Sequence, residues 1–100
     1  MMSELKDSQW LHALKERRKR IDQIDQKLLS LLNQRLSIAL EIGAMKRERG
    51  EKIYDPQREE QILQKLHLRN RGPLRSEDLT KIFKKIMIVC RKSQIRSDSC

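Results

Sequence analysis

The stretch that decides the fold is residues 11–45, LHALKERRKRIDQIDQKLLSLLNQRLSIALEIGAM. Its apolar residues recur in steps of three, four and seven, which is the spacing of one stripe along an α-helix. They are Leu11, Leu14, Ile21, Ile24, Leu28, Leu31, Leu32, Ile38, Ala39, Ile42 and Met45. The stretch has no proline and a single glycine, Gly43. It therefore predicts one helix from about residue 9 to about residue 48.

The length of this helix bears on the assembly. At 1.5 Å per residue it measures roughly 60 Å, about twice the diameter of a globular domain of this size. Such a helix cannot bury its apolar stripe within its own chain. We therefore expect an all-α fold in which one long and two shorter helices per chain form an intertwined homodimer.

Two shorter helices follow a polar loop. Asp55 is a favoured N-cap and Pro56 suits the first helical position, so they predict the start of the second helix. Residues 70–73, NRGP, end it. Ser76 is predicted to cap a third helix, with acidic residues in its first turn. We expect residues 1–10 to be an N-terminal extension, 11–95 the functional domain, and 96–100 a flexible tail.

The expected cores of these two helices are apolar stripes. The residues concerned are Ile62, Leu63, Leu66, Leu79, Ile82, Phe83, Ile86, Met87 and Cys90.

The charge of the chain suggests a nucleic-acid binder, but its distribution does not. Lys and Arg number 23 against 14 Asp and Glu, a net charge of +9. The excess is spread over both halves, and the one dense run, residues 15–20, has no aromatic residue beside it to stack on bases. A solvated helix face is the favoured interpretation, and we expect no nucleic-acid partner.

Other classes are excluded by what the sequence lacks. No apolar run approaches the roughly 18 residues that span a bilayer, and the N-terminus has no signal-peptide core. We therefore expect a cytoplasmic protein without a membrane partner. Cys90 and Cys100 form neither a disulfide framework nor a metal-ligand cluster, so both are expected to be reduced and no metal site is predicted.

Charged residues lie where the long stripe should be apolar. Arg35 and Lys46 are eleven residues apart, about three turns, with Ala39 on the same face between them. Their Cα atoms are roughly 16 Å apart, so their long side chains could hold one small anion. Alternatively, each extends to solvent or pairs with Glu59 or Glu60. Periodicity alone leaves both interpretations open.

Two further polar residues have similar alternatives. Arg18 lies roughly 25 Å before Arg35 along the helix axis, so it reaches the same pocket only from the partner helix of an antiparallel dimer. Otherwise it belongs to the charged surface of residues 15–20. Gln94 follows Cys90 by one turn, and either donates a hydrogen bond into a cavity or simply ends the stripe.

These residues together resemble the all-helical class of chorismate mutase. The resemblance covers residues 11–95, and its most specific part is Arg35 and Lys46 followed by the pattern D-x-x-R-E at residues 55–59. The matching residues are Arg18, Asp25, Leu28, Leu32, Arg35, Gly43, Lys46, Asp55, Arg58, Glu59, Ile82, Phe83, Ile86 and Gln94.

The resemblance implies an isomerase that rearranges chorismate to prephenate for phenylalanine and tyrosine synthesis, in the shikimate pathway. It implies a homodimer with two sites, no cofactor and no metal. Arg18 of the partner chain and Arg35 would bind the two substrate carboxylates. Lys46 would contact a carboxylate and the ether oxygen, and Gln94 would donate to that oxygen from the other side.

The remaining roles concern the ring hydroxyl and the pocket wall. The resemblance assigns the hydroxyl to Glu59 and to the backbone of Asp55, with Arg58 supporting Glu59. Cys90 departs from the family pattern, which commonly has a small hydroxyl residue near a substrate carboxylate. We expect Cys90 to shape the pocket without acting as a nucleophile.

Catalysis of this reaction requires no acid, base or nucleophile. It follows from holding the reactive conformer and stabilising charge on the breaking ether oxygen. A rate enhancement of about 10⁶ corresponds to roughly 8 kcal/mol, and one electrostatic donor supplies about 3 to 4 kcal/mol. Lys46, Gln94 and conformer selection are together sufficient.

Two alternatives remain. A lyase of the same fold would eliminate pyruvate from isochorismate to give salicylate, but the complete set Asp55, Arg58 and Glu59 favours the mutase. A basic helical nucleic-acid-binding module would explain the charge, but it leaves Arg35 and Lys46 on an apolar stripe unexplained.

Overall fold

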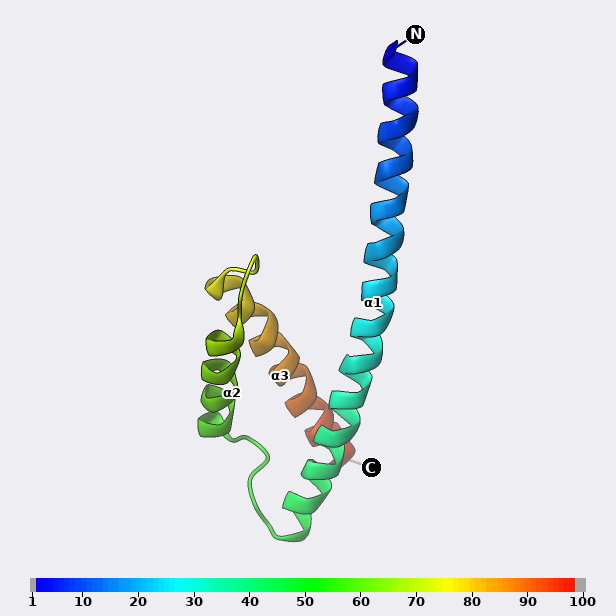
Figure 1. The fold of residues 1–100 in the computed structure, drawn as a ribbon. Coiled ribbons are helices and arrows are strands. Elements are labelled where there is room, and N and C mark those ends of the chain that lie inside the picture. Colours follow the sequence, from blue (N-terminus) through cyan, green and yellow to red (C-terminus); the bar gives the residue numbers. More distant parts are fainter. Residues whose placement is uncertain (1, 99–100) are drawn as a thin grey trace. The chain divides into compact units, whose positions relative to one another are not determined.

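The computed structural model describes residues 2–98, with side chains described at positions 6–96. Three helices account for most of this range: α1 (Met2–Glu48), α2 (Pro56–Arg69) and α3 (Ser76–Asp98) (Figure 1). Residues 2–98 contain no strand. The predicted all-α chain of one long and two shorter helices is confirmed.

Helix α1 begins at Met2, earlier than the predicted start near residue 9. The apolar stripe begins only at Leu11, but residues 2–10 contain neither proline nor glycine, so nothing in them interrupts a helix. The helix ends as predicted at Glu48. Gly50 follows with φ 68°, and the Glu51 N–H donates to the Lys46 carbonyl at 2.8 Å. A glycine in the left-handed region just beyond a helix is a common way to end it.

The chain divides into two compact units, residues 1–35 and residues 36–100. In the first unit, none of the side chains described at positions 6–35 is buried. Its exposed large apolar residues are Trp10, Leu11, Ile21, Ile24, Leu28, Leu29 and Leu31. This unit is therefore helix without a core of its own.

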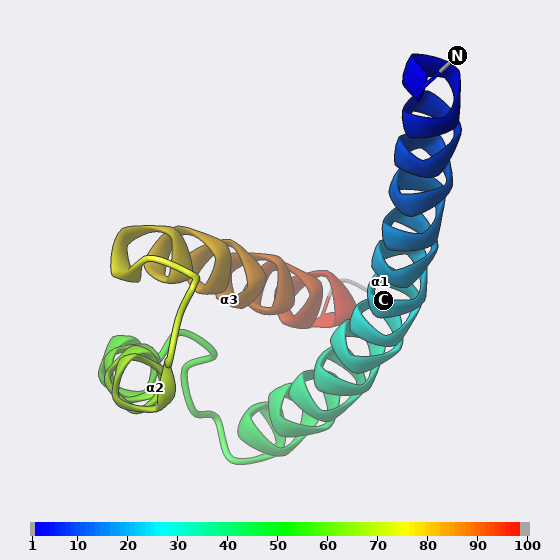
Figure 2. The same cartoon turned by 45° about the horizontal axis from the view of Figure 1, so that its top comes forward.

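The second unit has a core between α2 and α3, which lie side by side in both ribbon views (Figures 1 and 2). Leu63, Leu79 and Met87 are buried there, with Ile62, Leu66 and Phe83 packed against them. The predicted stripes are confirmed at these positions. Ile82 differs: it is 48% exposed, because it lies one residue, or about 100°, away from Phe83 around the helix.

Polar contacts fix the hairpin formed by α2 and α3. The ring nitrogen Nε2 of His67 lies 2.9 Å from Oγ1 of Thr80, so the two helices are hydrogen-bonded near the turn. Asn70 ends α2, as predicted, and its Nδ2 donates to the Leu74 carbonyl at 2.8 Å. Gly72 has φ 75°, a conformation that favours glycine. The sharp turn is therefore held by its own side chains.

Helix α3 differs slightly from the prediction at both ends. It includes Ser76 as its first residue, and the Leu79 N–H donates to the Arg75 carbonyl, so the capping position is Arg75. It continues to Asp98, which makes residues 96–98 helical where a frayed tail was expected. Positions 99 and 100, and with them Cys100, lie outside the described residues. Within residues 2–98, no helix combines the length and apolarity needed to span a membrane.

Candidate functional site

A close approach of α1 and α3 within the second unit fixes Gln94. Its Nε2 donates to the Ala39 carbonyl at 2.6 Å. Gly43, one turn further along α1, is buried, and a Cβ atom added there would lie 3.2 Å from Cγ of Gln94. Arg47 adds a bond from Nη1 to the Gln94 backbone carbonyl at 3.3 Å. Glycine at position 43 thus leaves room for the Gln94 side chain.

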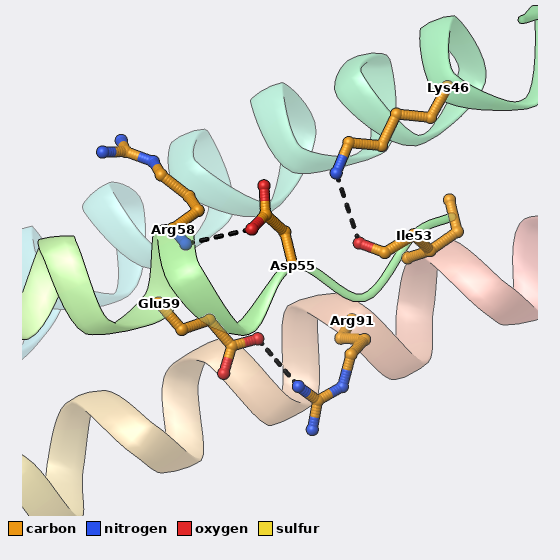
Figure 3. A network of polar contacts seen from close by, with 6 residues as sticks. All are labelled: Lys46, Ile53, Asp55, Arg58, Glu59 and Arg91. Atoms are coloured by element: carbon orange, nitrogen blue, oxygen red, sulfur yellow. Dashed lines mark hydrogen bonds and ion pairs between the residues drawn. The ribbon is translucent and has the colours of Figure 1, made fainter. Parts of the chain in front are cut away.

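Lys46 lies on the same stripe of α1 that Gln94 contacts. It is three residues beyond Gly43 and seven beyond Ala39, and residues at these spacings share one helix face. The Lys46 side chain is half-buried, and Nζ donates to the Ile53 carbonyl at 3.4 Å (Figure 3). The long bond is a weak one. The Gln94 amide therefore lies against the same face of α1 that carries the Lys46 ammonium group.

Asp55 ends the connecting segment, residues 49–55, and caps α2. Its Oδ1 accepts from the Arg58 backbone N–H at 3.0 Å (Figure 3). Pro56 occupies the first helical position, which needs no N–H donor. The predicted capping role of Asp55 is confirmed, and the cap fixes where Glu59, one turn later, leaves the helix.

Glu59 is paired with a residue that sequence reasoning missed. Arg91 of α3 donates from Nη1 to Glu59 Oε2 at 2.7 Å, with the two side chains 23% and 26% exposed. The same guanidinium lies over the Tyr54 ring, 4.1 Å from its centroid. Arg58, the expected support for Glu59, is exposed, and its guanidinium points away from Glu59 (Figure 3). That expectation is wrong in this structure, because Arg91 takes the position.

A sequence signal for Arg91 did exist. It follows Met87 by four residues, so it lies at the edge of the apolar stripe of α3. The same criterion had selected Arg35 and Lys46 on α1. Applied to α3, it would have found Arg91 beside Cys90.

The predicted residues fall into both units of the chain. Lys46, Asp55, Glu59, Cys90 and Gln94 belong to residues 36–100. Cys90 is buried on α3, one turn before Gln94.

Arg18 and Arg35 belong to the first unit, residues 1–35, and lie on α1. Arg18 is exposed and Arg35 is half-buried. The candidate groups for the ether oxygen and the hydroxyl therefore all belong to the second unit.

A surface hollow of about 350 Å³ lies between α2 and α3. Charged residues line it together with an aromatic ring: Tyr54, Glu59, Lys84 and Arg91 are among them. Of the predicted site residues only Glu59 lines it. Among the residues whose positions the structure describes, no three His, Cys, Asp or Glu side chains are grouped so as to hold a metal ion.

The sequence of this chain matches a known family. The sequence model of chorismate mutase type II matches residues 17–95, which include all the predicted site residues. The chain belongs to the chorismate mutase type II family. The resemblance inferred from the spacing of Arg35, Lys46 and residues 55–59 is confirmed.

Individual members of the chorismate mutase family are similar over most of this chain. A chorismate mutase structure from Thermus thermophilus superposes with a TM-score of 0.82 at 35% identity, covering 83% of this chain and 94% of that one. A bifunctional chorismate mutase/prephenate dehydratase from Aquifex aeolicus is 37% identical over 84 residues, 80% of this chain and 23% of that protein. A chorismate mutase from Methanocaldococcus jannaschii is 39% identical over 56 residues, 56% of this chain and 57% of that protein. The chain thus spans less than a quarter of the bifunctional relative.

Proposed function

We propose that this chain catalyses the rearrangement of chorismate to prephenate in aromatic amino acid biosynthesis, as an isomerase. The observation that carries the proposal is that the Gln94 side chain of α3 packs against the face of α1 that carries Lys46, in a chain of the chorismate mutase type II family. The Thermus and Methanocaldococcus proteins named for this activity support it. A cytoplasmic location is part of the same proposal.

Lys46 and Gln94 are the groups that act on the reacting atoms. Negative charge builds up on the ether oxygen as its bond to carbon breaks, and fixed donors directed at that oxygen stabilise the transition state. Lys46 supplies a cation whose weak bond to the Ile53 carbonyl is readily exchanged for substrate. The Gln94 amide carries two hydrogens, and the bond to Ala39 uses one and fixes the plane of the group.

The ring hydroxyl is assigned to the start of α2. Glu59 accepts it, and the Asp55 backbone provides a second contact. A carboxylate can accept about four hydrogen bonds. Glu59 can therefore accept the ring hydroxyl while it remains bonded to Arg91. Cys90, buried one turn before Gln94, shapes the wall of the pocket.

The two substrate carboxylates are assigned to Arg35 and to Arg18 of a second copy of the chain. Planar guanidinium groups bind carboxylates through two parallel bonds. A homodimer is supported by the apolar surface of α1, where Ile24 is 61% and Leu31 is 59% exposed. Burying these side chains against a second α1 removes the apolar surface from water and brings Arg18 to the partner's site.

The deciding experiment follows chorismate absorbance together with prephenate formation, using protein expressed in a host that lacks its own chorismate mutase. We expect turnover by the wild-type chain and a large loss in an Arg35→Ala variant purified in the same way. Salicylate formed from isochorismate, with no prephenate from chorismate, would identify the lyase instead. Salt-dependent DNA binding at physiological ionic strength, with chorismate unchanged, would identify the nucleic-acid-binding alternative.

A further inference from the structure

Arg91 joins two parts of the proposed site that are separated in sequence. Its guanidinium bonds Glu59 in the first turn of α2 and covers Tyr54 in the connecting segment. Arg91 itself lies on α3, between Cys90 and the turn that carries Gln94. One side chain of α3 thus contacts both α2 and the connecting segment, and we name Arg91, Glu59 and Tyr54 the Arg91 clamp.

We propose that Arg91 is a positioning residue that holds Glu59 and the connecting segment in place for the substrate hydroxyl. This inference rests on the proposed function, which assigns that hydroxyl to Glu59 and Asp55. Arg91 acts through these groups and is not assigned a contact with the substrate. The proposal adds a residue that the resemblance did not assign.

The geometry of the ion pair supports the first half of the proposal. The 2.7 Å distance is typical of a strong, charge-assisted bond. About three quarters of each side chain is covered, so solvent screens this pair less than it does a more exposed ion pair at the start of α3. In that pair, between Arg75 and Asp78, the arginine is 78% exposed. Arg91 therefore restrains the rotamer of Glu59 far more effectively than a surface pair would.

The Tyr54 contact supports the second half. A guanidinium 4.1 Å from an aromatic centroid is within the range of a cation–π interaction. Tyr54 directly precedes Asp55 and follows Ile53, whose carbonyl accepts the bond from Lys46. Holding the Tyr54 ring thus fixes the segment that carries both the Asp55 backbone and the Ile53 carbonyl, which accepts the bond from Lys46.

The kinetic test compares Arg91→Ala with Arg91→Lys and with Arg75→Ala as the matched control. Because Glu59 binds the hydroxyl in substrate and transition state alike, we expect Arg91→Ala to raise KM about ten-fold while kcat changes less than about three-fold. Arg91→Lys keeps a cation for Glu59 and should recover most of the loss. Arg75→Ala should leave both constants unchanged. Far-ultraviolet circular dichroism checks that each variant is folded.

A double-mutant cycle separates positioning from general stabilisation. In a Glu59→Gln background, Arg91→Ala should raise KM clearly less than ten-fold, because the charge-assisted pair with Glu59 has already been weakened and mainly the contact with Tyr54 remains to be lost. An undiminished ten-fold effect in that background would overturn the role of Arg91 through Glu59. Unchanged KM in Arg91→Ala itself would do the same.

A measurement without substrate tests the hold on the connecting segment. Trypsin cleaves after Arg49 and Lys52, and mass spectrometry follows cleavage at these sites in the native protein. Arg91→Ala and Tyr54→Leu should both speed cleavage several-fold, whereas Tyr54→Phe keeps the ring and should match the wild type. Equal rates in all variants would overturn this part of the proposal. Failure of the wild-type chain to consume chorismate would instead overturn the proposed function.

Discussion

The two units of this chain differ in what holds them together. Residues 36–100 contain a core between α2 and α3, in which Leu63, Leu79 and Met87 are less than 8% exposed. Residues 1–35 contain a helix on which many large apolar side chains are about half exposed or more, such as Ile24 at 61% and Leu28 at 49%. One unit is stabilised by its own packing, and the other has a surface suited to a second chain. The candidate site residues are divided between the same two units.

This division suggests a separation of tasks. The second unit holds Lys46 and Gln94, the groups assigned to the breaking bond, through contacts within one chain. The first unit holds Arg18 and Arg35, the groups assigned to the substrate carboxylates. Changes in the second unit should therefore affect the chemistry, and changes in the first should affect assembly and shared binding.

The largest effect is expected at Lys46. Lys46→Ala removes the cation assigned to the ether oxygen, and loss of one such donor typically lowers kcat by about 10²- to 10³-fold. Helical content and dimerisation should remain, because the bond from Lys46 Nζ to the Ile53 carbonyl is long, at 3.4 Å, and contributes little to stability. Steady-state kinetics and analytical ultracentrifugation provide the measurements. Lys65→Ala, at an exposed position of α2, is the control; equal kcat values in the two variants would remove Lys46 from the mechanism.

The next largest effect tests whether sites are shared between chains. Arg18→Ala and Arg35→Ala should each be nearly inactive alone. After random subunit exchange, half of the dimers are mixed and each has one intact site, so activity should return to about a quarter of the wild-type value. Exchange is verified with differently tagged subunits. Mixed dimers that stay inactive would show that Arg18 is not donated across the interface.

The free energy of unfolding tests whether the apolar side chains of residues 1–35 are buried against a second chain or exposed to solvent. Leu28 is 49% exposed in the single chain. If a second α1 covers it, Leu28→Ala should lower the free energy of unfolding by about 2 kcal/mol or more, and the midpoint should depend on protein concentration. Leu68→Ala, at a position 78% exposed on α2, should change stability little. Equal small losses in denaturant titrations would argue against the dimer.

The smallest effect is expected at the approach of α1 and α3. Gly43→Ala introduces a Cβ atom 3.2 Å from Cγ of Gln94, so the glutamine must shift. Overpacking of this kind costs about 1 to 3 kcal/mol, offset by up to about 1 kcal/mol from the better helix propensity of alanine. We expect a modest loss of stability and a larger loss of kcat. Thermal unfolding and steady-state kinetics test this. A wild-type kcat in Gly43→Ala would show that catalysis does not depend on the exact position of the Gln94 side chain.

Local sequence determined most of the helical architecture. Repeating apolar positions predicted α1 and the stripes of α2 and α3, since a helix places residues three and four apart on one face. Asp55 and Pro56 predicted the start of α2 because capping depends on neighbours in the chain. The start of α1 at Met2 was missed because the apolar pattern begins only at Leu11, nine residues after the helix begins.

Spacing also identified Arg35, Lys46 and Gln94 as polar residues in apolar stripes, and their order along the chain indicated the family. Only the tertiary structure decided which groups they contact. The bond from Gln94 to Ala39 spans 55 positions, and the pairing of Glu59 with Arg91 spans 32. Contacts between helices depend on how the helices are rotated and packed against each other, which the period of one helix does not specify. For that reason the partner expected for Glu59, Arg58, came from the family resemblance alone, whereas the structure shows Arg91 bonded to Glu59.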